Sequence, residues 1–168
     1  IYTPLNLHSN LIGDFNYRHP KMSKHLWLYE GVTEYFSVLI QMRGNIKSVN
    51  ETLTEILKKK IIKSRHYPDS IPFTLMSKNV FEEPYKSLYT QVYERGAILG
   101  MLLDFKIMSL TNGEKTLKDV IFDLSNKYGQ NKSFNEEDFI KEFVSMVHPD
   151  LQIFFDDYIS GKKALDIS

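Results

Sequence analysis

Residues 27–36 read Trp-Leu-Tyr-Glu-Gly-Val-Thr-Glu-Tyr-Phe, and this stretch sets two carboxylates among aromatic and apolar side chains. Burying a carboxylate is costly unless a cation, a metal ion or several hydrogen bonds compensate its charge. Glu30, which lies close to Leu28 and Val32 in the sequence, therefore requires such a partner. This requirement is the first indication of function in the chain.

Helical spacing divides this stretch and its surroundings into two faces. An apolar stripe contains Leu28, Val32, Tyr35, Leu39 and Met42, and another face contains Ser23, Trp27, Glu30, Glu34, Ser37 and Gln41. Glu30 and Glu34 therefore project from the same side, one turn apart. The pattern alone leaves two interpretations open: either both carboxylates are solvated, or Glu30 binds a partner.

The composition is ordinary for one globular domain, with 168 residues of which 42% are hydrophobic and 25% charged. The 21 basic and 21 acidic residues cancel, which argues against charge-driven binding of nucleic acid or of an anionic membrane. Cysteine is absent, so His, Asp, Glu and Tyr are left for chemistry. No window approaches the roughly 20 apolar residues that span a bilayer. The sequence does not indicate a compartment.

Start and stop signals predict an all-α fold. Helices are expected from Met22 or Ser23 to Gly44, Ser48 through Ile61, Pro84 to Leu110, Thr116 to Gly129, Ser133 to Val147, and Leu151 to Gly161. Capping boxes are expected at Ser48–Glu51, Thr116–Asp119 and Ser133–Glu136. Between these helices, a short extended piece is possible at residues 73–75.

Several residues inside these helices carry more specific expectations. Gly96 and Gly100 each cost about 1 kcal/mol of helix propensity relative to alanine, which is explained if another backbone approaches closely there. The run Lys58-Lys59-Lys60 is expected on a solvated face, opposite the apolar positions Leu53, Ile56, Leu57 and Ile61. The histidines of the N-terminal quarter are expected to form hydrogen bonds or lie at the surface rather than bind metal: His8, His19 and His25.

Residues 26–36 resemble the L-W-x-x-E-G-x-T-x-Y-[YF] segment of the glycyl aminopeptidase family of thermolysin-like zinc metallopeptidases. In that family this Glu is the third zinc ligand, and the other two are the histidines of an H-E-x-x-H helix. The resemblance therefore implies Zn²⁺ as the cofactor and Glu30 as a metal ligand. The family's spacing would put the second histidine immediately before Ile1, and Pro4 fits the end of that helix.

A second segment, residues 92–97, resembles the Y-E-[KR]-G-A segment of the wider group of zinc aminopeptidases. There the tyrosine hydroxyl stabilises the oxyanion of the tetrahedral intermediate, so the resemblance implies a catalytic role for Tyr93. The plain alternative is that Tyr93 only packs. Glu34 occupies a position that the family often fills with a small polar residue, and it is interpreted as an acceptor for a ligand histidine or, by preference, as a surface charge.

Residues 151–161 are similar to the ending of the same catalytic domain, so the resemblance covers nearly the whole chain. We therefore expect residues 1–168 to form an irregular helical bundle, the C-terminal helical subdomain of a thermolysin-like peptidase and a fragment of a longer chain. The implied activity is a zinc aminopeptidase that releases N-terminal Gly or Ala. Its expected partners are a peptide substrate and the rest of its own catalytic domain, with neither nucleic acid nor membrane.

The fragment alone is expected to be inactive and to hold zinc weakly, because it lacks H-E-x-x-H and offers a single ligand. The alternative hypothesis is a non-catalytic helical interaction domain of a degenerate peptidase homologue. The residues immediately upstream of Ile1 in the parent gene would distinguish the two.

Overall fold

The computed structural model describes residues 7–129 and 131–166, apart from the side chains of residues 55 and 56. Within these residues the chain is helical and has no strand, and an isolated parallel bridge pairs Ser9 with Phe134. The all-α prediction is confirmed. The expected helix end at Ile1–Pro4 lies outside the described residues. Of the described helices, none combines the length and apolar character needed to cross a bilayer.

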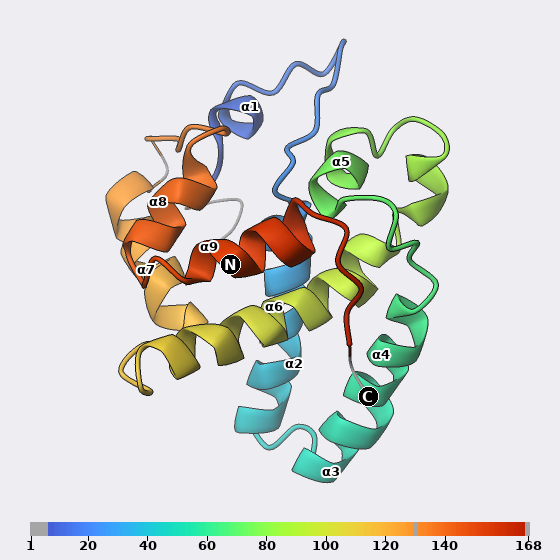
Figure 1. Cartoon of the computed structure of the whole chain (residues 1–168), viewed down its shortest axis with the longest axis vertical. Coiled ribbons are helices and arrows are strands. Elements are labelled where there is room, and N and C mark those ends of the chain that lie inside the picture. Colours follow the sequence, from blue (N-terminus) through green and yellow to red (C-terminus); the bar gives the residue numbers. More distant parts are fainter. Residues whose placement is uncertain (1–6, 130, 167–168) are drawn as a thin grey trace.

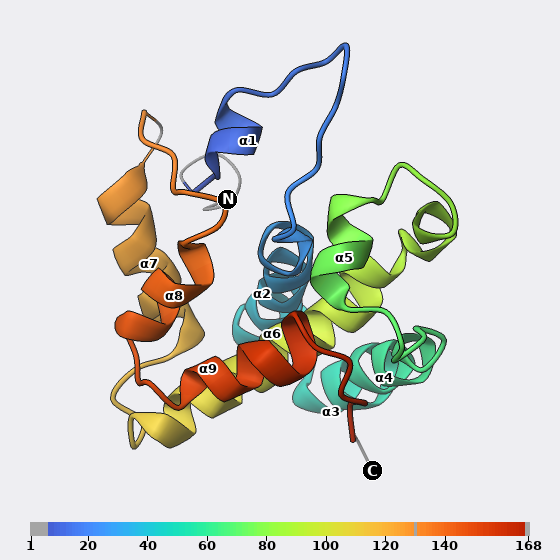
Figure 2. The ribbon, with the colours of Figure 1, turned by 45° about the horizontal axis from the view of Figure 1, so that its top comes forward.

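One long helix, α6 (Gln91–Leu110), runs through the centre of the molecule (Figure 1). A second helix crosses it; its first part, η1 (Trp27–Val32), is wound as a π-helix and continues into α2 (Thr33–Arg43). The C-terminal helix, formed by α9 (Leu151–Phe154) and η4 (Phe155–Ile159), packs along α6 and runs in the opposite direction (Figure 2). The crossing of α6 and η1 is the framework of the fold.

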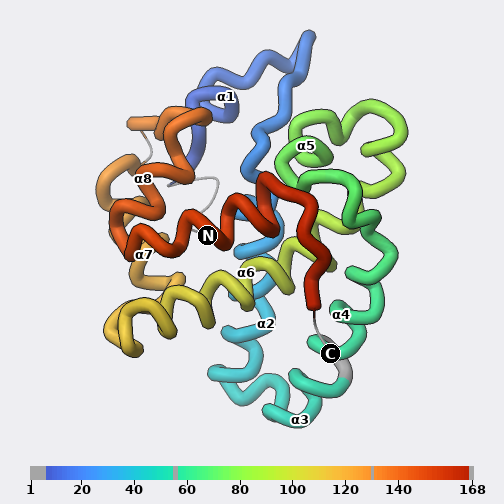
Figure 3. The backbone as a smooth tube through the Cα atoms, viewed as in Figure 1, coloured from blue at the N-terminus to red at the C-terminus, as the bar shows by residue number. Residues whose placement is uncertain are grey.

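The other elements gather at the two ends of α6. One end holds α7 (Leu117–Tyr128) and α8 (Phe139–Ser145). The other end holds α5 (Phe73–Lys78), η3 (Tyr85–Leu88) and a continuous helix composed of α3 (Val49–Glu51), η2 (Thr52–Leu57) and α4 (Lys58–Ser64). The short helix α1 (Asn10–Gly13) is followed by a segment that extends away from the other helices before η1 (Figure 3).

Local capping chemistry sets several helix ends as expected. The Ser48–Glu51 capping box opens the α3–α4 helix, and in the second box the Thr116 amide donates to the Asp119 carboxylate over 2.9 Å. Gly44 terminates α2. Gly113 and Gly129 follow α6 and α7 with φ of 82° and 63°, a conformation that glycine adopts without strain.

An aromatic cluster fills the core between η1, α8 and η4. Its members are His25, Trp27, Phe134, Phe139, Phe143 and Phe155. Trp27 Nε1 donates to His25 Nδ1 over 3.2 Å, so the opposite ring nitrogen carries the proton and donates to the Glu136 carbonyl over 2.8 Å. Burial lowers the pKa of His25, which keeps the ring neutral. Its expected hydrogen-bonding role is confirmed; His19 is exposed and His8 is half-buried.

Two expectations about helix starts were wrong, and both errors involve Glu136. Its buried carboxylate accepts from the Ser23 hydroxyl over 2.8 Å and from the Lys24 amide over 2.7 Å, so it holds the chain before η1 rather than capping α8. The Glu30 helix consequently begins near Trp27. Asn135 accepts from the amides that precede α8, which spans Phe139–Ser145 and is shorter than expected.

Other differences are local. The suggested extended piece at residues 73–75 is the start of α5, because Phe73, Met76 and Ser77 share the buried face of a helix. The segment from Pro84 to Leu110 is not one helix, since η3 precedes α6. Leu53 is 52% exposed instead of packed, Leu57 and Ile61 are half-buried, and the side chain of Ile56 lies outside the described part.

Candidate active site

The η1 and α6 helices touch backbone to backbone at two glycines. A Cβ atom on Gly31 would lie 2.7 Å from the backbone of Gly96, and one on Gly96 would lie 2.9 Å from the Cα of Gly31. At Gly100 a Cβ would meet Tyr35 at 3.3 Å and Val32 at 3.4 Å. The close backbone approach expected at Gly96 and Gly100 is therefore confirmed, and the approaching helix is the one that carries Glu30.

Replacing Gly96 with alanine is expected to lower the free energy of unfolding by about 1–3 kcal/mol, because the new methyl group meets backbone atoms that cannot rotate away. Chemical denaturation measures this change. Gly100→Ala is the matched control: its contacts are looser and alanine favours the helix, so we expect a smaller loss or none. A Gly100→Ala variant less stable than Gly96→Ala would contradict a crossing centred on Gly31 and Gly96.

The glycine crossing brings Glu30 and Tyr93 together. Glu30 precedes Gly31 on η1, and Tyr93 lies about one turn before Gly96 on α6. A hydrogen bond to the Tyr89 hydroxyl, 3.2 Å away, is the main cause that raises the pKa of Tyr93; partial burial and the negative charge of the nearby Glu30 carboxylate add to it. Both side chains are half-buried. The two predicted site residues are thus neighbours in space.

Glu30 differs from Glu34 in how its charge is compensated. Glu34 forms an ion pair of 2.7 Å with Lys60, whereas none of the lysines or arginines in the described part pairs with Glu30. A half-buried carboxylate with uncompensated charge suits a metal ion as a ligand. Across residues 7–129 and 131–166, no three His, Asp or Glu side chains converge on a possible metal position. The described residues can therefore supply one ligand to a metal ion, Glu30, but they do not form a complete metal site.

Lys60 links the Glu30 helix to the Tyr93 helix. Its Nζ lies 2.7 Å from Glu34 and 3.3 Å from Glu94, and Lys63 pairs with Glu94 at 2.9 Å. Partial burial opposes ionisation of Glu94, but hydrogen bonds and charge from the two lysines outweigh it and keep the pKa of Glu94 low.

The expectation of a solvated Lys60 was wrong, although Lys58 and Lys59 are exposed. Glu34 is not an unpaired surface charge, because its carboxylate is paired with Lys60. None of the histidines in the described part forms a hydrogen bond or ion pair with it.

Arg95 anchors the start of α6 to the segment that follows α4. Its guanidinium pairs with Asp69 at 2.8 Å and lies 4.8 Å above the centre of the Tyr67 ring. Sequence interpretation missed Tyr89, Glu94 and Lys60 as neighbours of the site. Sequence spacing could have indicated two of them, because Tyr89 lies four residues before Tyr93 and Glu94 directly follows Tyr93.

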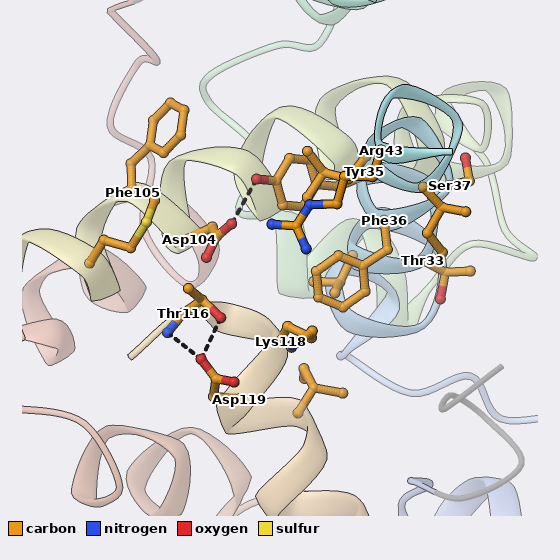
Figure 4. Close-up of a pocket in the computed structure, with 15 residues that line it drawn as sticks. Thr33, Tyr35, Phe36, Ser37, Arg43, Asp104, Phe105, Thr116, Lys118 and Asp119 are labelled. Atoms are coloured by element: carbon orange, nitrogen blue, oxygen red, sulfur yellow. Dashed lines mark hydrogen bonds between the residues drawn. The ribbon is translucent and has the colours of Figure 1, made fainter. Parts of the chain in front are cut away.

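A groove of about 1000 Å³ lies between α2, α6 and α7 (Figure 4). Thr33, close after Glu30, lies at its edge, and Phe36, Phe105 and Met108 contribute apolar surface. Deeper in, the Tyr35 hydroxyl donates to the buried Asp104 carboxylate over 2.7 Å. Asp104 also accepts from the backbone amide that opens α7, at 2.7 Å, which fixes α7 to α6.

Two comparisons with known proteins find similarity. The fold is similar to the crystal structure of an aminopeptidase N family protein from Idiomarina loihiensis, with a TM-score of 0.85 and 18% sequence identity. The match covers 99% of this chain but 30% of that structure, so the chain spans less than a third of the relative's length. No individually curated protein matches in sequence.

The sequence also matches the family model described as M61 glycyl aminopeptidase, over residues 5–99, more than half of the chain. The matched residues include η1, α2 and the first part of α6, and hence Glu30, Tyr93 and both glycines of the crossing. The glycine crossing that joins these residues is therefore a feature of the matched region. This chain belongs to the M61 glycyl aminopeptidase family.

Proposed function

We propose that this chain is the C-terminal helical part of the catalytic domain of a zinc-dependent aminopeptidase, which releases N-terminal Gly or Ala from peptides. The observation that carries the proposal is the pairing of Glu30 with Tyr93 across the Gly31–Gly96 contact, within the region matched by the family. A metal ligand and a hydroxyl donor must lie close together to act on one scissile bond.

Glu30 would hold the zinc ion through its carboxylate. Bound zinc would supply an activated water and polarise the peptide carbonyl. In support, the Glu30 carboxylate lacks a compensating cation among the described residues, whereas Glu34, one turn further, has Lys60. The missing ligands and the general base would come from a part of the protein other than residues 7–129 and 131–166.

Tyr93 would donate its hydroxyl hydrogen to the oxyanion that forms during attack on the carbonyl. Such a donor must remain protonated at neutral pH, and the raised pKa of Tyr93, caused mainly by its hydrogen bond with Tyr89, favours the protonated form. Either hydroxyl can be the donor in that hydrogen bond, and when Tyr89 donates, the Tyr93 oxygen is held in place while its hydrogen is free for the oxyanion. A donor held in place beforehand stabilises developing charge without a cost of reorganisation.

The rest of the catalytic domain is a necessary partner in this proposal. The groove between α2, α6 and α7 is the surface on which we propose that it packs, because the groove is lined largely by apolar side chains such as Phe36 and Phe105. A segment seated there would pack against the helix that carries Glu30, since Thr33 and Phe36 of that helix line the groove. The peptide substrate would bind at Glu30 and Tyr93.

The test compares the complete protein with residues 1–168 alone. We expect the complete protein to bind about one zinc per chain and to hydrolyse Gly- and Ala-amides faster than Leu- or Lys-amides, and a chelator to remove this activity until zinc is restored. Residues 1–168 alone should be inactive and hold zinc weakly. A complete protein that contains no zinc and cleaves none of these amides would instead support a non-catalytic helical interaction domain.

A further inference from the structure

We infer that Lys60 is a positioning residue: its buried ammonium group ties the helix that carries Glu30 to the helix that carries Tyr93. The inference rests on the proposed peptidase function and adds a third element, α4, to the site. Lys60 does not contact the reacting groups itself. It acts through Glu34 and Glu94.

The contacts of Lys60 place it between the two helices. Its Nζ lies 2.7 Å from Glu34 on α2 and 3.3 Å from Glu94 on α6. Glu34 is one turn beyond Glu30, and Glu94 directly follows Tyr93. Each carboxylate that Lys60 binds is therefore rigidly connected, through helical backbone, to one of the two proposed site residues.

Burial distinguishes Lys60 from the other lysines of its helix. Its side chain is 11% exposed, whereas that of Lys63, one turn further along α4, is 60% exposed. Lysine is rarely buried unless it is paired, and here two carboxylates compensate the charge. With Lys63 also on Glu94, two ammonium groups balance two carboxylates, so the cluster carries no net charge.

Two ties besides Lys60 hold the helices together on the C-terminal side of Gly96: the contact at Gly100 and the hydrogen bond from Tyr35 to Asp104. On the N-terminal side of Gly96, where Tyr93 lies, the Glu34–Lys60–Glu94 bridge is the tie that the ion pairs provide. It opposes small movements of this end of α6 relative to the helix that carries Glu30. A misplacement of about 1 Å at a reacting group can cost as much as roughly a hundredfold in rate, so small movements matter.

Lys60→Met in the complete protein is the test, because methionine keeps the length of the side chain and removes its charge. We expect kcat to fall about ten- to a hundredfold, while KM changes less than about twofold and the zinc content per chain is unchanged. Lys60→Arg, which keeps the charge, should recover most of the rate. Lys59→Met is the matched control on an exposed neighbour and should leave kcat unchanged.

Two measurements separate positioning from general loss of stability. Assays are run well below the melting temperature of each variant, determined by circular dichroism. Lys60→Met is also combined with Tyr93→Phe. The double variant should be nearly as active as Tyr93→Phe alone, because Lys60 cannot position a hydroxyl that has been removed. A wild-type kcat for Lys60→Met, or the same fold loss in both backgrounds, would overturn the inference. An inactive wild-type protein would refute the proposed function itself and this role with it.

Discussion

Replacing Glu30 with glutamine in the complete protein is expected to abolish tight zinc binding and, with it, peptidase activity. The amide has nearly the shape of the carboxylate but no negative charge, and zinc ligands from this residue type bind as anions. Loss of a group that only supports a ligand costs roughly 10- to 100-fold in metal affinity or activity, so loss of the ligand itself should cost more. Elemental analysis of dialysed protein and kcat/KM measure the two effects.

Glu34→Gln is the matched control for this substitution. It removes a carboxylate from the same helix, one turn away, whose charge is already compensated by Lys60. We expect this variant to retain its zinc. If Glu30→Gln kept one zinc per chain after dialysis, Glu30 would not be a metal ligand, whatever happened to its activity.

Tyr93→Phe should give the opposite pattern, with zinc retained and turnover lost. The ring remains to pack against Tyr89, but the hydroxyl that would donate to the oxyanion is gone. Removal of one such donor costs about 10²- to 10³-fold in kcat, and because the oxyanion exists only in the transition state, KM should change little. Steady-state kinetics with a Gly-amide substrate and zinc analysis on the same preparation test this prediction.

Tyr67→Phe controls for the loss of a tyrosine hydroxyl as such. The Tyr67 ring lies beneath Arg95, in the segment that follows α4, and its buried hydroxyl has no hydrogen-bond partner among the described residues. We expect its kcat to remain at the wild-type value. A Tyr93→Phe variant that kept more than a tenth of the wild-type kcat would show that Tyr93 only packs.

The features that the sequence predicted are those that local chemistry decides. The Ser48 and Thr116 capping boxes, the end of α2 at Gly44 and the end of α6 at Leu110 depend on residues within one turn of each other. Gly96 was interpreted correctly for a related reason, since glycine in a long apolar helix has a propensity cost that only close packing explains.

The features that the sequence did not predict depend on partners far away in the chain. Lys60 stands in a run of three lysines that is typical of a solvated face, and only the folded structure brings Glu34 and Glu94 to it. Glu136 fits a local capping box, yet it binds Ser23 and Lys24, more than a hundred residues earlier. In both cases long-range electrostatics outweighed the local pattern.

The candidate site was predicted in its parts and not in its assembly. Family resemblance singled out Glu30 and Tyr93 separately, because each lies in a short motif with a glycine. Neither motif predicts that Gly31 and Gly96 are in contact in the folded protein. That contact depends on how η1 crosses α6, which follows from the packing of the whole bundle.

Contact between two residues that have no side chains means that the thickness of the main chain sets the spacing of the two backbones from which the carboxylate and the phenol project. Any larger residue at either position would therefore push the two main chains apart, and no change of rotamer at the new side chain could restore their spacing.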